Sequence, residues 1–155
     1  MALPSFVAGS GPFPDRTGTW SIPGNAGPND LPPAQRTAAA SLYAALMTDT
    51  VLRLIGADGP TVIEGPFARN ALFVRALAVL TGRPAEASLS STGTSGGAAL
   101  LALGPPAEQF SAQARVMDAP AATGIQGLQV YAEGWRERAG RHRENALPLP
   151  EKALR

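Results

Sequence analysis

The stretch 61-TVIEGPFARNALFVRALAVLTGRP-84 decides the fold, because it holds a strand, a turn and a helix in a short length of chain. Thr61-Val62-Ile63 is a β-branched run, which is typical of a short buried strand. Gly65-Pro66 indicates a turn directly after it. A helix is predicted from about Arg69 to Thr81, and Gly82 stands where a left-handed helix cap is wanted. The stretch therefore predicts a strand-turn-helix unit.

The elements around this unit continue the alternation. A longer helix is predicted from about Pro33 to Ile55, with Asn29 or Asp30 as its cap and Gly56 as its stop. Residues 85–88 (AEAS) are a weak strand candidate, supported by position rather than composition. The two helices each carry an apolar stripe, formed by Leu42, Tyr43, Leu46, Met47, Val51 and Leu54 in the first and by Leu72, Phe73, Ala76, Leu77 and Leu80 in the second.

Two further helices are expected downstream. The text 90-SSTGTSGGAALLALGPP-106 indicates a polar loop entering a short helix, in which we interpret Gly96-Gly97 as a packing feature rather than a phosphate cradle. Another helix is predicted from Ile125 to about Glu144, with Trp135 as a core residue. Strands that alternate with helices indicate an α/β fold with parallel strand pairing.

The ends of the chain differ from its middle. Residues 1–33 hold seven of the fifteen prolines and five of the seventeen glycines, so continuous helix is excluded there. We expect short extended pieces at Ser5–Ala8 and Thr19–Ile22, although a disordered linker is the alternative. The predicted organisation is an irregular segment over 1–33, an α/β lobe over 34–145 and a loose tail over 146–155.

Composition excludes several classes of protein. The 155 residues include no cysteine and one histidine, His142, and the net charge is +1. Disulfides, thiolate chemistry and Cys- or His-rich metal sites are therefore excluded, and a general nucleic-acid binder is not expected. There is no apolar run long enough to span a membrane. The first residues show no secretory signal, so we expect a cytoplasmic protein.

The text EGPFARN (64–70) is the candidate binding site. A loop that leaves the carboxyl end of a parallel strand lies where open α/β sheets bind ligands. Gly65 lacks a Cβ, so a flat ring or a phosphate can approach its backbone. Asn70 has a donor and an acceptor and could recognise a purine edge. The alternative is that Gly65-Pro66 only makes the turn and Asn70 only caps the helix.

Other polar features give weaker signals. The text 135-WRERAGRHR-143 could bind phosphate or RNA, but interleaved glutamates favour a solvated helix face. Asp49 lies inside the long helix between two threonines, and we expect it to face a polar interface. No pair of carboxylates has a spacing that indicates acid–base catalysis, and we assign no catalytic residue and no metal ligand in this chain.

Several motifs in order resemble the C-terminal lobe of FGGY-type carbohydrate kinases. They are Glu64-Gly65, Ala68-Arg69-Asn70, Thr81-Gly82-Arg83-Pro84 and, further on, Gly93-Thr94 followed by 97-GAALLA-102. The resemblance covers about residues 40–104. It implies a ribonuclease H-like fold of the actin-like ATPase group, here as a partial C-terminal lobe with parallel strands flanked by helices.

The resemblance also implies a function. In that family the turn and the Asn or Ser after it form the adenosine pocket, so Gly65, Pro66 and Asn70 would line an ATP site. Pro66 departs from the pattern, because a second glycine is usual there and proline lacks the N–H. The implied activity is that of a phosphotransferase, which uses ATP and Mg²⁺ to phosphorylate a sugar or polyol hydroxyl.

The family's Asp-x-Gly-Thr opening, sugar site and catalytic Asp have no counterpart in this sequence. We therefore expect a C-terminal piece of a longer kinase, the product of an interrupted gene, or one chain of a two-chain enzyme, inactive alone. An inactive nucleotide-binding or interaction module is the alternative. An apolar face is expected where the N-terminal lobe would pack, so a homodimer is one expectation for the isolated chain.

Overall fold

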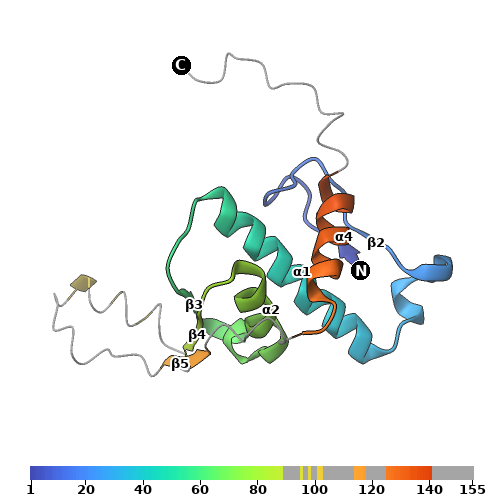
Figure 1. The fold of residues 1–155 in the computed structure, drawn as a ribbon. Helices are drawn as coiled ribbons and strands as arrows, with labels where there is room; N and C mark the ends of the chain where they lie inside the picture. Colours follow the sequence, from blue (N-terminus) through green and yellow to red (C-terminus); the bar gives the residue numbers. More distant parts are fainter. Residues whose placement is uncertain (89–94, 96–97, 99–100, 103–113, 118–124, 141–155) are drawn as a thin grey trace, which may run out of the picture.

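The structure is a computed structural model, and it describes residues 1–88, 95, 98, 101–102, 114–117 and 125–140. No helix in these ranges is long and apolar enough to cross a membrane. The strands and helices, drawn in Figure 1, are β1 (Ala2–Leu3), β2 (Thr19–Trp20), α1 (Pro33–Leu54), β3 (Thr61–Ile63), α2 (Ala71–Thr81), β4 (Ala85–Ser88), β5 (Ala114–Met117) and α4 (Leu128–Gly140), with short 3₁₀ turns at Pro23–Asn25, Pro28–Asp30 and Gly65–Arg69.

The predicted parallel strand pair is confirmed. β3 pairs with β4 in parallel, with Thr61 opposite Ala85 and Ile63 opposite Ala87, and α2 makes the connection between them. β5 adds to the other side of β4 in the antiparallel direction. The weakly predicted strand at 85–88 is therefore real. β3 was expected to be buried throughout, but only Ile63 is, because Val62 points to the opposite face of the sheet.

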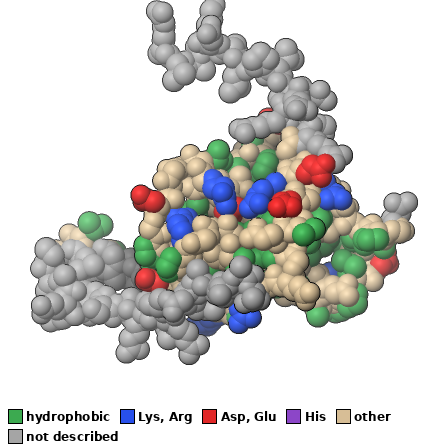
Figure 2. Space-filling view, viewed as in Figure 1, with side chains coloured by type: hydrophobic (Ala, Val, Ile, Leu, Met, Phe, Trp, Pro, Cys, Tyr) green, Lys and Arg blue, Asp and Glu red, His purple; other side chains and the backbone are tan. Residues whose placement is uncertain are grey.

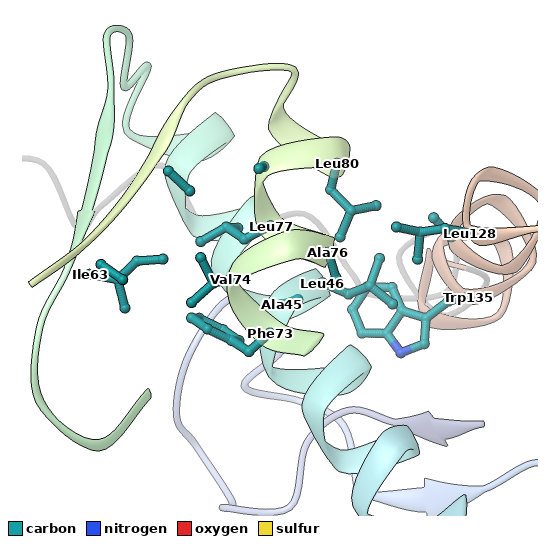
Figure 3. Packing of buried hydrophobic residues seen from close by; sticks show 14 of the residues in the cluster. Ala45, Leu46, Ile63, Phe73, Val74, Ala76, Leu77, Leu80, Leu128 and Trp135 are labelled. Carbon is teal, nitrogen blue, oxygen red and sulfur yellow. The ribbon is translucent and has the colours of Figure 1, made fainter. Parts of the chain in front are cut away.

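The core is built around α2, which lies between the sheet and α4 (Figure 3). On one side of α2, Phe73, Val74 and Leu77 point towards Ile63 of β3. On the other side, Leu80 lies towards α4, where Leu128 and Trp135 are buried. Four of the five residues predicted for the apolar face are buried; Leu72 is only partly so. The buried residues of the helix are Phe73, Val74, Ala76, Leu77, Ala78 and Leu80.

The predicted apolar stripe of α1 is partly wrong. Leu46 is fully buried, but Val51 and Leu54 are 39% and 60% exposed. The buried face instead holds Ser41, Ala45, Leu46 and Asp49. Residues 41, 45 and 49 are spaced four apart and so share one side of the helix. The small side chains at 41 and 45 allow neighbouring elements to approach closely.

Short sequence motifs correctly predicted where α1 and α2 end. Gly56 and Gly82, which follow α1 and α2, have φ values of +64° and +67°, as left-handed stops require. The cap predicted for α1 is wrong, because the helix begins after Pro32 with no side-chain cap. Asp30 instead accepts a hydrogen bond from the N–H of Gly27 at 2.7 Å, and this bond closes the turn before the helix.

The first 32 residues pack against α4 and α1. β1 and β2 form an antiparallel pair, and Trp135 Nε1 donates to the carbonyl oxygen of Ala2 at 2.8 Å. The ring of Phe13 meets the Trp135 ring edge-on, with centroids 5.7 Å apart. Arg16 donates to the carbonyl oxygens of Ala139 (2.6 Å) and Arg138 (3.0 Å), which lie at the end of α4.

Of the two extended pieces predicted in this segment, the structure confirms one and contradicts the other. Thr19–Ile22 was expected to be extended, and β2 occupies Thr19–Trp20. Ser5–Ala8 was also expected to be extended, and this is wrong. The chain turns there, because Ser5 Oγ donates to the carbonyl of Val7 and the N–H of Ser10 bonds to the same carbonyl. The first strand lies earlier, at Ala2–Leu3.

Candidate functional site

The candidate site is the corner formed by residues 64–70, between the end of β3 and the start of α2. Gly65–Arg69 forms a 3₁₀ turn, and Gly65 has a φ of +72°, which a residue with a Cβ rarely adopts. A Cβ built on Gly65 would meet no atom within 4 Å. The backbone here is therefore open to approach, although Pro66 offers no N–H to a ligand.

Asn70 caps α2, as one of the two sequence interpretations predicted. Its Oδ1 accepts a hydrogen bond from the N–H of Phe73 at 3.0 Å, which satisfies one of the free donors at the helix start. The nitrogen of the same amide donates to Ser41 Oγ at 2.9 Å. Asn70 as a whole residue is partly exposed. Capping does not exclude ligand binding, because Nδ2 carries a second hydrogen.

Ser41 is the member of this site that sequence reasoning missed. It belongs to α1 and is 5% exposed, and its hydroxyl donates to the carbonyl of Thr37 at 2.9 Å. Its contact with Asn70 joins residues 29 positions apart in the chain. The sequence offered one weak signal, a polar residue among small apolar ones in a long helix.

An aromatic pair lies beside the corner. Phe67 is 48% exposed, and its ring packs on Phe73 of α2 with centroids 4.8 Å apart. Glu64 and Arg69 are exposed. The corner therefore combines an accessible backbone, an exposed aromatic surface and one amide. Such a set suits a flat heterocycle better than a metal ion.

The described residues offer nothing comparable for a cation. No group of three or more acidic or histidine side chains in these ranges could hold a metal ion. His142 and the text 90–106 lie outside the described residues, apart from isolated positions of the latter.

Asp49 forms a second polar centre, away from the corner. It is 1% exposed and accepts hydrogen bonds from Arg53 Nε and Arg136 Nη2, both at 2.9 Å. Arg53 also donates to the carbonyl of Leu80 at the end of α2, at 2.9 Å. The interpretation of the arginines in 135–143 as a solvated face is wrong for Arg136, which binds this buried carboxylate. Asp49 does face a polar contact, as expected.

Charges of both signs gather near this centre. Figure 2 shows blue and red side chains in a band that runs from the C-terminal half of α1 across to α4. The band has no large area of one sign in that view. It differs from the continuous basic surface that nucleic-acid binding proteins carry.

A shallow hollow lies between the first residues, α1 and α4. It has a volume of about 270 Å³ and is lined mostly by apolar side chains, with Gln35 and Tyr131 among the polar ones. Burial raises the pKa of Tyr131 above its ordinary value of 10.0. None of the residues predicted for the binding site lines this hollow, so it is separate from the 64–70 corner.

Comparison with known proteins agrees with the architecture. The family model described as carbohydrate kinase FGGY, C-terminal domain, matches residues 1–113. A solved structure, that of a carbohydrate kinase from Novosphingobium aromaticivorans, is similar with a TM-score of 0.68 and 30% sequence identity. The similarity covers 90% of this chain and 28% of that kinase. A search of curated proteins found no match.

Proposed function

We propose, since this chain belongs to the FGGY carbohydrate kinase family as a C-terminal domain, that it is the ATP-binding part of such a kinase. The predicted fold, a C-terminal lobe of the actin-like group with a parallel strand pair and flanking helices, is the one this membership gives. The chain spans about 28% of the length of the similar kinase. The activity of a whole enzyme is therefore part of the proposal.

The observation that carries the proposal is the open backbone at Gly65, beside the exposed ring of Phe67 and the amide of Asn70. In the proposed complex the adenine ring lies across Gly65 and Pro66, and Asn70 donates a hydrogen bond to it. Mg-ATP supplies the phosphoryl group that a sugar or polyol hydroxyl accepts. In this chain Gly65, Pro66 and Asn70 hold the base end of the nucleotide.

The remaining parts of the reaction are assigned elsewhere. We propose that the catalytic Asp, the sugar site and most contacts to Mg²⁺ belong to a lobe outside this sequence, joined to it or supplied by a partner chain. This chain alone is then inactive as a phosphotransferase. A cytoplasmic location, where ATP is abundant, fits this role.

Isothermal titration of the purified chain with Mg-ATP tests the proposal. We expect micromolar binding, with Mg-CTP weaker because a pyrimidine covers less of the corner. Replacing Pro66 with Gly restores a backbone N–H and should raise ATP affinity by about two- to fivefold, the worth of one hydrogen bond. Absence of any binding by the wild-type chain would reject an ATP-binding role.

A second function competes for the same observations. Pro66 removes a backbone donor from the turn, and the Asn70 side chain already forms two hydrogen bonds within the protein. Both observations favour an inactive interaction module that keeps the fold. Titration separates the two proposals, since the module should bind no nucleotide. Sequencing the DNA upstream of the Met1 codon adds an independent test, because an extension that carries the Asp-x-Gly-Thr motif would support the kinase.

A further inference from the structure

The amide of Asn70 is held in one orientation from both ends. The N–H of Phe73 can only donate, so the atom that faces it at 3.0 Å is the oxygen, Oδ1. The nitrogen then faces Ser41 Oγ at 2.9 Å. A rotated amide would place its NH₂ group against the N–H of Phe73. The helix start and Ser41 therefore select the same orientation.

The proton of Ser41 completes the arrangement. It goes to the carbonyl of Thr37, at 2.9 Å, so the hydroxyl oxygen presents a lone pair to Asn70. One hydrogen of Nδ2 fills that lone pair. The other has no partner among the described residues, and Asn70 as a residue is partly exposed. Asn70 thus keeps one N–H for a ligand, while its oxygen is turned towards the helix.

We propose that Ser41 is a positioning residue of the nucleotide site: together with the N–H of Phe73, which holds Oδ1, it fixes Nδ2 of Asn70 so that its remaining N–H, rather than the oxygen, meets the base. This inference rests on the function proposed for the 64–70 corner. An N–H recognises an acceptor, and the acceptors of adenine are its ring nitrogens. Asn70 therefore contacts a ring nitrogen of the base and not the exocyclic amino group, which is a donor.

Replacing ring nitrogens one at a time tests this contact. Isothermal titration would compare Mg-ATP with its 1-deaza, 3-deaza and 7-deaza analogues, in each of which a C–H replaces one acceptor. The wild-type chain should bind one of the three about three- to tenfold more weakly than ATP, the worth of one hydrogen bond. In Ser41→Ala, which lacks the acceptor for Nδ2, that penalty should shrink to less than about twofold.

Two further variants separate positioning from stability. Thr48 of α1 makes the same kind of bond as Ser41, from Oγ1 to the carbonyl of Ala44 at 2.9 Å, but it is not bonded to Asn70. Thr48→Val should therefore keep the wild-type analogue penalty. Asn70→Asp keeps a capping oxygen but has no N–H to give, so it should fold, lose affinity for ATP and show no penalty for any analogue.

Three results would overturn the inference. The first is an analogue penalty in Ser41→Ala equal to that of the wild type. The second is a wild-type chain that binds ATP and all three analogues equally. The third is a wild-type chain that binds no nucleoside triphosphate, which rejects the proposed function as well and is seen before any substitution is made.

Discussion

α1 contacts α2 and α4 through two kinds of polar chemistry. In its first half, Ser41 forms a neutral contact with Asn70 at the beginning of α2, the neutral end of the α1–α2 interface. In its last two turns, Asp49 and Arg53 form charged contacts with Arg136 of α4 and with the carbonyl of Leu80 at the end of α2, the charged end of that interface. The earlier residue of α1 therefore meets the start of α2 and the later one meets its end, so α1 and α2 run in the same direction.

The difference shows which contact is free to serve a ligand. The carboxylate of Asp49 is almost fully buried and is bound by two arginines, so it acts as a structural link between helices. In the neutral contact, one N–H of the Asn70 amide has no hydrogen-bond partner among the described residues, and Asn70 is partly exposed. We infer that the charged end supports the fold and the neutral end supports binding. Two substitutions test that division, and a third tests the contribution of α4.

The largest effect is expected at the charged end. Asp49→Ala removes the buried partner of two arginines and should lower the free energy of unfolding by about 3 kcal/mol. The melting temperature should fall by roughly 6–12 °C, as followed by circular dichroism. Asp58 is exposed, so Asp58→Ala is the matched control and should change stability by less than about 0.5 kcal/mol. Equal melting of both variants would contradict a structural role for Asp49.

A smaller loss of stability is expected at the neutral end. Asn70→Ala removes the cap of α2 and should cost about 1 kcal/mol, while ATP affinity falls by about three- to tenfold. Urea unfolding and titration measure the two effects on one sample. Unchanged affinity together with the stability loss would leave Asn70 with the capping role alone and weaken the proposed division.

The smallest effect is expected on the face of α4 that carries Tyr131. Burial raises the pKa of its phenol in the folded state, so the folded protein holds this proton more tightly than the unfolded chain does. The stability that this contributes is present below the ordinary pKa of 10.0 and is lost as pH rises through the folded-state value.

Tyr131→Phe removes that titration. Urea unfolding at pH 8 and pH 11 should show a smaller alkaline loss of stability in the variant than in the wild type. The same alkaline loss in both proteins would mean that other groups dominate.

Features set by a few neighbouring residues could be predicted from the sequence. The β-branched run at 61–63, the left-handed stop at Gly82 and the cap at Asn70 each depend on positions close along the chain. Parallel pairing followed from the order of elements. The structure confirms the strand, the stop and the parallel pairing, and it shows the cap at Asn70, which was one of two interpretations of that residue. The role of Gly65, Pro66 and Asn70 in binding ATP came from a family resemblance, and it stays a prediction.

Features set by distant residues could not be predicted. Asp49 binds Arg136, which is 87 positions away in the sequence. Helical periodicity alone gave no reason to predict that Arg136 differs from the other arginines of the expected solvent-exposed face. The buried side of α1 depends on the helices that pack on it, so Val51 and Leu54 were wrongly included. Ser41 depends on the distant start of α2. Spacing patterns carry no information about such pairs.

β3 has an open side that affects how the isolated chain should be handled. In the part of the chain that the structure describes, β3 is the outer strand of its sheet, and Val62 on it is 59% exposed. An outer strand offers unpaired backbone groups to any other strand. A further strand from a longer protein would pair with this edge, and without one the isolated chain is expected to aggregate at high concentration. The substitution Val62→Lys places a charge on the edge and should reduce that aggregation during storage and crystallisation trials.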